Sequence, residues 1–250
     1  MKASLYFLLA FLLLSFSSYS QSTTGTRGLV KAPTARMFED GTLALGAAFI
    51  PPGYHKATYG WQKGKLIGDA GLNTFVTVNL FPFMEVMFRY THTFNYKVTP
   101  QTRYFPDRMF SARVRLIEEN KKFPAIVLGI QDVAGFFDSQ VLNNSSEPNF
   151  SSFYLVGSKK IEINSLIIDA SLGFGTRVKQ FYAKEFKGLF GGVEISTPYL
   201  EDTQLLLDYD ATYINIGVQK QFFKRLHTMV NYYPNYQKIG WVLAYRYKMY

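Results

Sequence analysis

The stretch LNTFVTVNLFPFMEVMFRYTH, residues 72–92, decides the fold class of this chain. Apolar and polar side chains alternate on both sides of a tight turn at Phe81-Pro82-Phe83. One face of the first segment carries Leu72, Thr74, Val76, Val78 and Leu80, and the other face carries mostly Asn73, Thr77 and Asn79. The returning segment, 84–92, alternates in the same way. A period of two on either side of a short reversal is typical of a β-hairpin, so the stretch predicts antiparallel β structure.

The same pattern continues outward along the chain in both directions. Further strands are predicted at 42–50, 110–116, 125–133, 152–160, 166–174, 188–196, 203–209, 213–222, 226–233 and 240–250. Short connections alternate with long polar ones, of which 51–71 and 134–151 are examples. This alternation suits a barrel whose two rims face different compartments. We therefore predict an all-β fold, an antiparallel transmembrane β-barrel of about twelve strands, the even count that bacterial barrels favour.

The last predicted strand is the clearest of the set. Its apolar and aromatic face comprises Trp241, Leu243, Tyr245, Tyr247 and Met249. A chain that ends in such an amphipathic aromatic strand resembles the C-terminal signal by which outer-membrane barrels are recognised, with Tyr250 in the place of the more usual Phe. The chain has 18 Tyr and 23 Phe, which also favours a membrane barrel. A secreted soluble β-sandwich or jelly roll is the alternative, because it alternates in the same way.

Residues 1–20 have the organisation of a signal peptide, with Lys2, an apolar run over 5–14 and Ser18-Tyr19-Ser20 before the expected cleavage site. An uncleaved anchor is the alternative, although the run is shorter than the roughly 20 residues that a spanning helix needs. We expect three parts: the signal peptide 1–20, a segment 21–41 that either folds into the barrel mouth as a plug or leaves a narrow pore, and a barrel at 42–250. The chain has no Cys and therefore no disulfide.

Charged residues on the polar strand faces are the candidate site. Arg113 and Arg115 would each cost about 2–4 kcal/mol if they faced lipid at mid-membrane, so we expect them in the lumen or near a rim. Together with three other charged residues, they form the candidate site for sugar or lipid contact: Arg89, Arg113, Arg115, Glu194 and Asp208. A solvated, ion-paired barrel interior is the alternative. The net charge of +9, or +8 once Lys2 leaves with the signal peptide, suits lipopolysaccharide phosphates or an anionic polysaccharide as partners.

The sequence offers little for catalysis. His55, His92 and His227 are far apart and lack metal-ligand spacing, and no nucleophile elbow or nucleotide-binding loop is present. We predict that the protein is not an enzyme and uses no cofactor or metal. A rim enzyme that acts on lipid or glycan through His92 or His227 and a nearby Ser is the alternative. Nucleic acid is not expected as a partner, because the cations are dispersed over alternate strand faces.

Several separated stretches resemble the YjbH family, outer-membrane β-barrels linked to bacterial exopolysaccharide production. They are 28–35 with 40–43, 80–86, 128–135, 154–159, 192–194 and 205–210. This chain departs from the family pattern in three ways. Ala134-Gly135-Phe136 stands where the family usually has Gly-Gly-Thr, and Asp208 stands where Glu is common. The chain is also short.

This resemblance implies the outer membrane of a Gram-negative bacterium and a role in exopolysaccharide biosynthesis, export or surface attachment, with export-machinery proteins as partners. An adhesin or assembly partner that acts through the loops 51–71 and 134–151 is the alternative.

Overall fold

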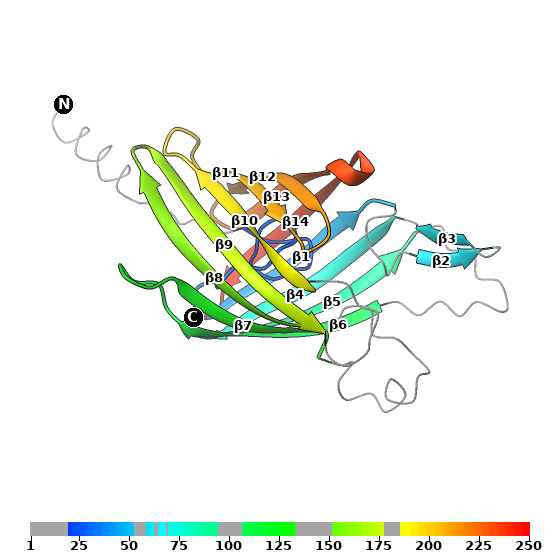
Figure 1. Ribbon diagram of the computed structural model, residues 1–250, viewed down its shortest axis with the longest axis horizontal. Coiled ribbons are helices and arrows are strands. Elements are labelled where there is room, and N and C mark those ends of the chain that lie inside the picture. The colour runs from blue at the N-terminus through cyan, green and yellow to red at the C-terminus, as the bar shows by residue number, and fades with distance from the viewer. Residues whose placement is uncertain are drawn as a thin grey trace.

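The computed structural model describes residues 20–52, 59–62, 65–68, 70–94, 107–133, 152–177 and 186–250. Twelve of its strands form one closed antiparallel barrel (Figure 1). These strands are β1 (Thr42–Ile50), β4 (Gly71–Phe81), β5 (Met84–Thr93), β6 (Asp107–Ile117), β7 (Ala125–Gln131), β8 (Ser152–Ile163), β9 (Leu166–Arg177), β10 (Gly188–Ser196), β11 (Thr203–Tyr209), β12 (Ile214–Phe222), β13 (Leu226–Tyr233) and β14 (Lys238–Lys248). The predicted signal peptide up to residue 19 and the whole of the predicted loop 134–151 lie outside the described residues.

Neighbouring strands of the barrel follow one another along the chain, and β1 closes it by pairing with both β4 and β14. In the closing pair, Thr42 lies opposite Lys248 and Phe49 lies opposite Trp241. The predicted all-β antiparallel barrel of about twelve strands is confirmed. Among the described residues, no helix is long and apolar enough to cross a membrane.

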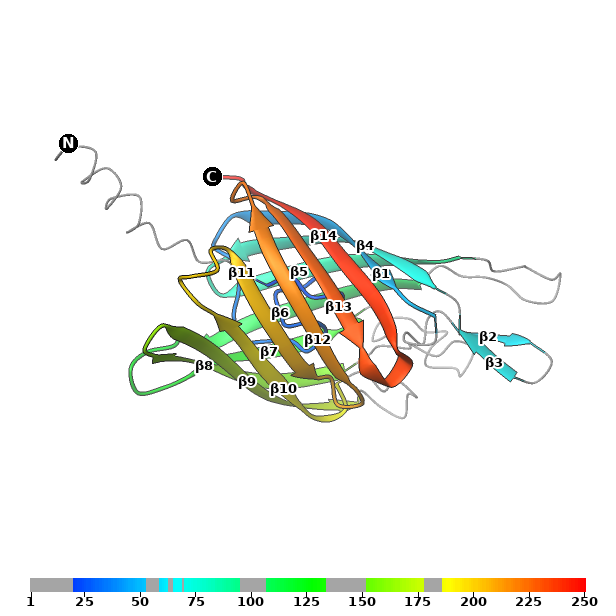
Figure 2. The same cartoon turned by 90° about the horizontal axis from the view of Figure 1, so that it is seen from above.

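The barrel has two different rims. Tight turns after β4, β6, β8, β10 and β12 lie at one rim, together with the start of β1 and the C-terminus; we call it the short-turn rim. The connections after β1, β5, β7 and β9 lie at the other, the long-loop rim (Figures 1 and 2). The sequence interpretation treated 51–71 as a plain loop, but the structure has a hairpin there, β2 (Tyr59–Gln62) with β3 (Lys65–Gly68), which projects beyond the barrel (Figure 1). Its four-residue strands are too short to give a clear alternating pattern.

On many strands, apolar side chains face outward and polar side chains face the lumen, which is the opposite of the arrangement in a soluble protein. On β11, Gln204 and Asp208 are buried, whereas Leu205 and Leu207 are exposed. On β14, Arg246 is buried, whereas Trp241 and Leu243 are exposed. Because the side-chain period of a strand is two, most strands present an apolar face to the outside and a more polar face to the lumen. β1 is an exception, since it turns Ala44 and Ala48 inward. The faces predicted for 72–80, 84–92 and 240–248 are those observed.

The lumen is filled by residues 20–38, which we call the inner segment. All of them are buried except Arg36, which is half-buried, and the dark blue chain is seen inside the barrel in Figure 2. Leu29 and Val30 pack with Phe75, Met87, Leu206 and other inward side chains. Ala32, Ala35 and Met37 pack in a second cluster with Tyr154, Phe186 and Phe190. The apolar core therefore lies between the inner segment and the apolar side chains that the barrel wall turns inward beside its polar ones.

The inner segment leaves the lumen through a turn at the short-turn rim. Asp40-Gly41 forms this turn, in which the Thr42 amide donates to the Glu39 carbonyl at 3.1 Å. Gly41 has a φ of +69°, and a Cβ there would come within 2.8 Å of the Tyr250 ring. Glycine tolerates both the positive φ and the close approach of the ring. The turn directs the chain from the lumen into β1.

Candidate functional site

Arg113 is the centre of the contacts between the barrel wall and the inner segment. Its guanidinium donates to the backbone carbonyls of Arg27 at 2.8 Å, Thr34 at 3.1 Å and Arg36 at 3.1 Å. The same group forms an ion pair with Glu85 at 2.8 Å, and both side chains are fully buried. A guanidinium carries several donors in a fixed plane, so one side chain on β6 gathers three carbonyls from separate parts of the inner segment.

Asp208 acts as the complementary acceptor on β11. One carboxylate oxygen accepts from the amides of Lys31 at 2.7 Å and Ala32 at 2.9 Å, and the other accepts from the Asn215 side-chain amide at 2.6 Å. The Lys31 ammonium pairs with Asp210 at 3.0 Å. Two consecutive amides on one carboxylate fix the position of the chain just before Pro33, which has no amide to satisfy.

Neutral side chains hold the rest of the inner segment, again through its backbone. The Asn73 amide donates to the Thr23 carbonyl at 3.1 Å, and the Thr77 hydroxyl donates to the Gly25 carbonyl at 2.6 Å. The Ser158 hydroxyl accepts from the Ala35 amide at 2.7 Å. Buried backbone groups need hydrogen-bond partners, and the inner segment supplies only some of them itself, for example from the Thr23 amide to the Val30 carbonyl at 2.9 Å. The inward polar side chains therefore satisfy the backbone of the inner segment.

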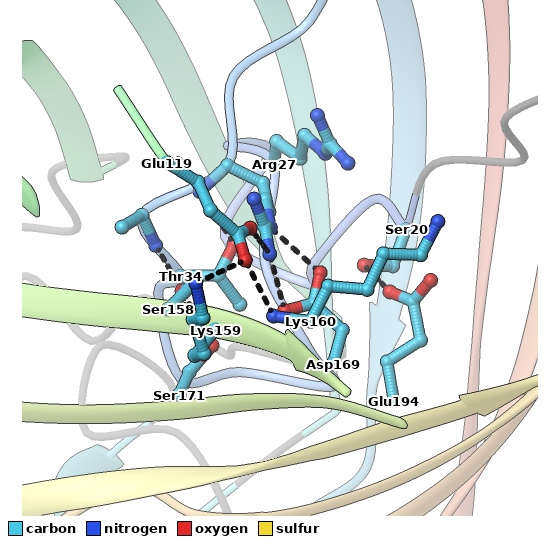
Figure 3. A network of polar contacts seen from close by, with 12 residues as sticks. Ser20, Arg27, Thr34, Glu119, Ser158, Lys159, Lys160, Asp169, Ser171 and Glu194 are labelled. Carbon is cyan, nitrogen blue, oxygen red and sulfur yellow. Dashed lines mark hydrogen bonds and ion pairs between the residues drawn. The ribbon is translucent and has the colours of Figure 1, made fainter. Parts of the chain in front are cut away.

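Charged side chains gather where the inner segment approaches the short-turn rim, and Figure 3 shows Glu119, Lys159 and Asp169 among them. The Arg36 guanidinium donates to both carboxylate oxygens of Asp169, at 2.7 and 2.9 Å, and pairs with Glu119. Glu119 also pairs with the Lys159 ammonium at 3.3 Å and accepts from the Lys160 amide at 3.0 Å. We call Arg36, Glu119, Lys159 and Asp169 the mouth cluster. It ties the end of the inner segment to the β6–β7 turn and to the β8–β9 hairpin.

The balance of charges in the mouth cluster moves two pKa values in opposite directions. Partial burial acts to raise the pKa of the Glu119 carboxyl, but the Lys160 amide and the Arg36 guanidinium outweigh it and leave that pKa below its usual value. Burial acts to lower the pKa of Arg36, but hydrogen bonds and charge attraction from Asp169 and Glu119 outweigh it and raise that pKa. Both groups are therefore held in their charged forms, as an ion pair requires.

The beginning of the inner segment lies at the same rim. The Ser20 hydroxyl donates to the Glu194 carboxylate at 2.8 Å, and the Gln21 amide donates to Nε2 of the buried His227 at 3.3 Å. Glu194 lies on β10 and His227 at the start of β13. The inner segment thus enters and leaves the lumen on the short-turn side.

The five residues predicted from the sequence do not form a single site. Arg113, Asp208 and Glu194 contact the inner segment, and Arg89 is fully buried on the inward face of β5. Arg115 lies instead at the short-turn rim, where it donates to the Pro82 carbonyl and pairs with Glu118 at 3.6 Å. Both Arg113 and Arg115 avoid the apolar outer face, as the cost of a charge in lipid requires. Contact of these residues with sugar stays a prediction.

Sequence reasoning missed other contacts of the inner segment. Asn73 and Thr77 were placed on the polar face of their strand, and only the presence of a chain inside the barrel gives them a role. Arg36 and Glu119 carry no local signal, because one lies in an irregular segment and the other in a charged turn. Their pairing depends on tertiary structure alone.

The histidines are not brought together. His92 lies at the long-loop end of β5, exposed and edge-on to Phe94, whereas His227 is buried at the short-turn end of β13. His55 is outside the described residues. Within the described ranges, no group of three His, Cys, Asp or Glu side chains has the geometry to hold a metal ion. A rim enzyme that uses either His92 or His227 with a nearby Ser stays a prediction.

Comparisons with known proteins place this chain in a family. The family described as "Exopolysaccharide biosynthesis protein YbjH" matches residues 20–244, which covers the inner segment and nearly the whole barrel. A curated relative, "Uncharacterized lipoprotein YjbH" of Escherichia coli (strain K12), is 27% identical in an alignment of 214 residues that covers 76% of this chain. The match covers 28% of that relative, so this chain spans under a third of its length. The chain belongs to the YjbH family of exopolysaccharide biosynthesis proteins.

Proposed function

We propose that this protein is an outer-membrane β-barrel of a Gram-negative bacterium that assists exopolysaccharide export or surface attachment while its own lumen stays closed. Family membership supports the link to exopolysaccharide. The name of the relative from Escherichia coli, a lipoprotein, supports a place in the cell envelope. The observation that carries the proposal is the sorting of side chains, with an apolar outer face around a barrel whose inside is occupied by the inner segment.

The outer face supports placement in a membrane. Large apolar side chains are exposed on the outward positions of the barrel strands, among them Leu128, Leu155, Leu172, Leu189, Val230 and Leu243. A soluble β-sandwich turns such residues toward its core, but here they face outward, although the core between the wall and the inner segment has apolar side chains of its own. In a bilayer, by contrast, the outward face is the apolar one. The rims then follow the usual barrel orientation, in which short turns face the periplasm and long loops face outward.

The inner segment makes the lumen a poor conduit for a polymer. A polysaccharide passing through would have to displace Leu29 and Val30 from their cluster, and full burial of each such side chain is worth about 1.5–3 kcal/mol. It would also have to replace the hydrogen bonds of Arg113 and Asp208. The protein therefore acts on exopolysaccharide through its surface or through partner proteins.

A disulfide between the inner segment and the wall tests this closed-lumen function. The chain has no Cys, so A35C/S158C introduces one pair at a place where the Ala35 amide and the Ser158 hydroxyl are 2.7 Å apart. Surface exopolysaccharide is expected to be the same with the disulfide formed as in the wild type. The single variants A35C and S158C serve as controls for the loss of either side chain. If exopolysaccharide falls with the disulfide formed and recovers with reductant, the lumen has to open and the proposal is wrong.

Gel mobility with and without boiling, measured on outer-membrane fractions, tests the membrane placement. A mobility shift of protein in that fraction is expected from a stable closed barrel. A soluble protein without a shift contradicts the placement and favours a secreted β protein.

The projecting hairpin favours a second candidate, an adhesin or assembly partner. β2 and β3 extend beyond the long-loop rim, where they are positioned to meet another molecule (Figure 1). Deletion of 59–68 is then expected to abolish partner capture while the barrel retains its mobility shift. If capture persists without the hairpin, this candidate is excluded for that element.

A further inference from the structure

The turn between β12 and β13 has an unfavourable conformation for its sequence. Phe223 and Lys224 have φ values of 51° and 62°, and the Arg225 amide donates to the Phe222 carbonyl at 3.1 Å. A two-residue hairpin turn with both central φ values positive strongly prefers Asn-Gly. A bulky aromatic residue in this conformation carries backbone strain. Phe223 is nevertheless 90% exposed, so packing against the protein does not compensate for that strain.

The neighbouring turn at the same rim is also apolar. Between β10 and β11, Tyr199 is 82% exposed and Leu200 is 55% exposed. The Gln221 amide donates to the Asp202 carbonyl at 2.9 Å, which connects the two turns. The exposed apolar side chains of these two turns form an apolar patch, and the exposure of such a patch to water is unfavourable. At the edge of a bilayer, the same side chains lie at the depth where barrels carry their aromatic girdle.

Two cations lie on aromatic rings of the outer face beside this patch. The Lys220 ammonium is 5.8 Å from the centre of the Phe222 ring. The Arg225 guanidinium carbon is 6.0 Å from the centre of the Tyr247 ring, and Nη1 donates to the Tyr245 hydroxyl at 3.3 Å. Such contacts orient a cation without neutralising it.

Four other cations at the short-turn rim form ion pairs with carboxylates. These ion pairs are Arg115 with Glu118, Lys159 with Glu119, Lys160 with Glu162 and Lys248 with Glu39. Glu201 and Asp202 stand in the turn next to Lys220 and Arg225, yet among the described residues no carboxylate lies within ion-pair distance of these two cations. Their charge is therefore available to an external anion that reaches the outer face.

We propose that Lys220 and Arg225 bind the headgroup of an anionic phospholipid in the leaflet that meets the short-turn rim, while Phe222, Phe223 and Tyr247 contact its acyl chains. This inference rests on the proposed membrane location. An anionic phospholipid combines a phosphate with apolar chains, which matches cations set on an apolar, aromatic surface. A juxtamembrane cation gains about fivefold in partition to anionic lipid, so two cations give a measurable preference.

Stability of the full-length barrel in lipid nanodiscs tests the proposal. The midpoint temperature of the mobility shift is compared in phosphatidylcholine and in a mixture with phosphatidylglycerol. The wild type is expected to be more stable in the mixture, with phosphatidylglycerol retained in native mass spectra, and K220Q/R225Q is expected to lose most of both effects. K121Q/K122Q is the matched control, because it removes two exposed rim cations in the β6–β7 turn, and it should keep both effects.

Several outcomes overturn the proposal. They are the absence of any preference for phosphatidylglycerol in the wild type, an equal loss in K121Q/K122Q, or the same stabilisation from inorganic phosphate added to phosphatidylcholine discs. A second variant, F223S, is expected to lower the midpoint in both lipids, and an unchanged midpoint contradicts the acyl contact. If the wild type shows no mobility shift in any lipid, the membrane placement itself has failed, which separates the two proposals.

Discussion

Arg113 and Arg115 lie two positions apart on β6 and have very different surroundings. Arg113 is buried between Glu85 and three carbonyls of the inner segment. We expect R113Q to destabilise the barrel by about 3–5 kcal/mol, because it leaves the Glu85 charge buried and unpaired. R115Q removes a pair with the exposed Glu118 and is expected to cost about 0–1 kcal/mol. The midpoint of the mobility shift in urea measures both, and equal effects would contradict the assigned burial of Arg113.

The sequence alone placed both arginines away from lipid, because their alternation with Phe110, Ala112 and Val114 is a local property. The sequence did not show that the two side chains lie in different environments. Pairing of β6 with β7 shifts register between Arg115 and Ile117, so the strand becomes irregular where Arg115 lies. The carbonyls that Arg113 binds belong to residues about eighty positions earlier, with no mark in the pattern of β6.

At the scale of elements, the mouth cluster predicts a pH dependence for the end of the inner segment. The pKa of Glu119 is lower in the folded protein than its usual 4.5, so its contribution to stability is present above about pH 4.5 and is lost as the pH falls through the folded value. Hydrogen exchange of the amides at 34–38 is expected to speed up between pH 5 and about pH 3, beyond the intrinsic change. E119Q should show faster exchange already at pH 5 and a smaller change on acidification. An identical pH response in E119Q would show that Glu119 does not hold the segment.

Strands were more predictable than the inner segment. The twelve barrel strands were predicted from segments of alternating apolar and polar residues and from the connections between them. The inner segment carries few local signals: Pro33 has no amide, and Asp40-Gly41 favours a turn. Its place inside the barrel depends on contacts with β4, β6, β8, β10, β11 and β13, and a local pattern does not encode such contacts.

At the scale of the whole molecule, the outer face distinguishes a membrane barrel from a soluble one. Leu172 lies near the middle of β9, faces outward and is 68% exposed. L172R is expected to cost about 2–4 kcal/mol if the barrel spans a bilayer. Surface substitutions in soluble proteins usually stay within about 0.5 kcal/mol, so a neutral result argues against a bilayer. I163R, at the exposed end of β8 next to the β8–β9 turn, is the control and should cost about 0–1 kcal/mol. The midpoint of unfolding in urea, measured in lipid vesicles, checks both.

The position of the inner segment also governs the order in which the molecule can assemble. Ser20, Gln21 and Lys31 find their partners 174, 206 and 177 residues later, on strands β10, β13 and β11. Contacts at such separations are late and slow to form, because a long loop has to close first. The earliest part of the folded chain to be synthesised must therefore wait for the last strands. Pairing of β1 with β14 seals the barrel, and if it came first it would shut the inner segment out.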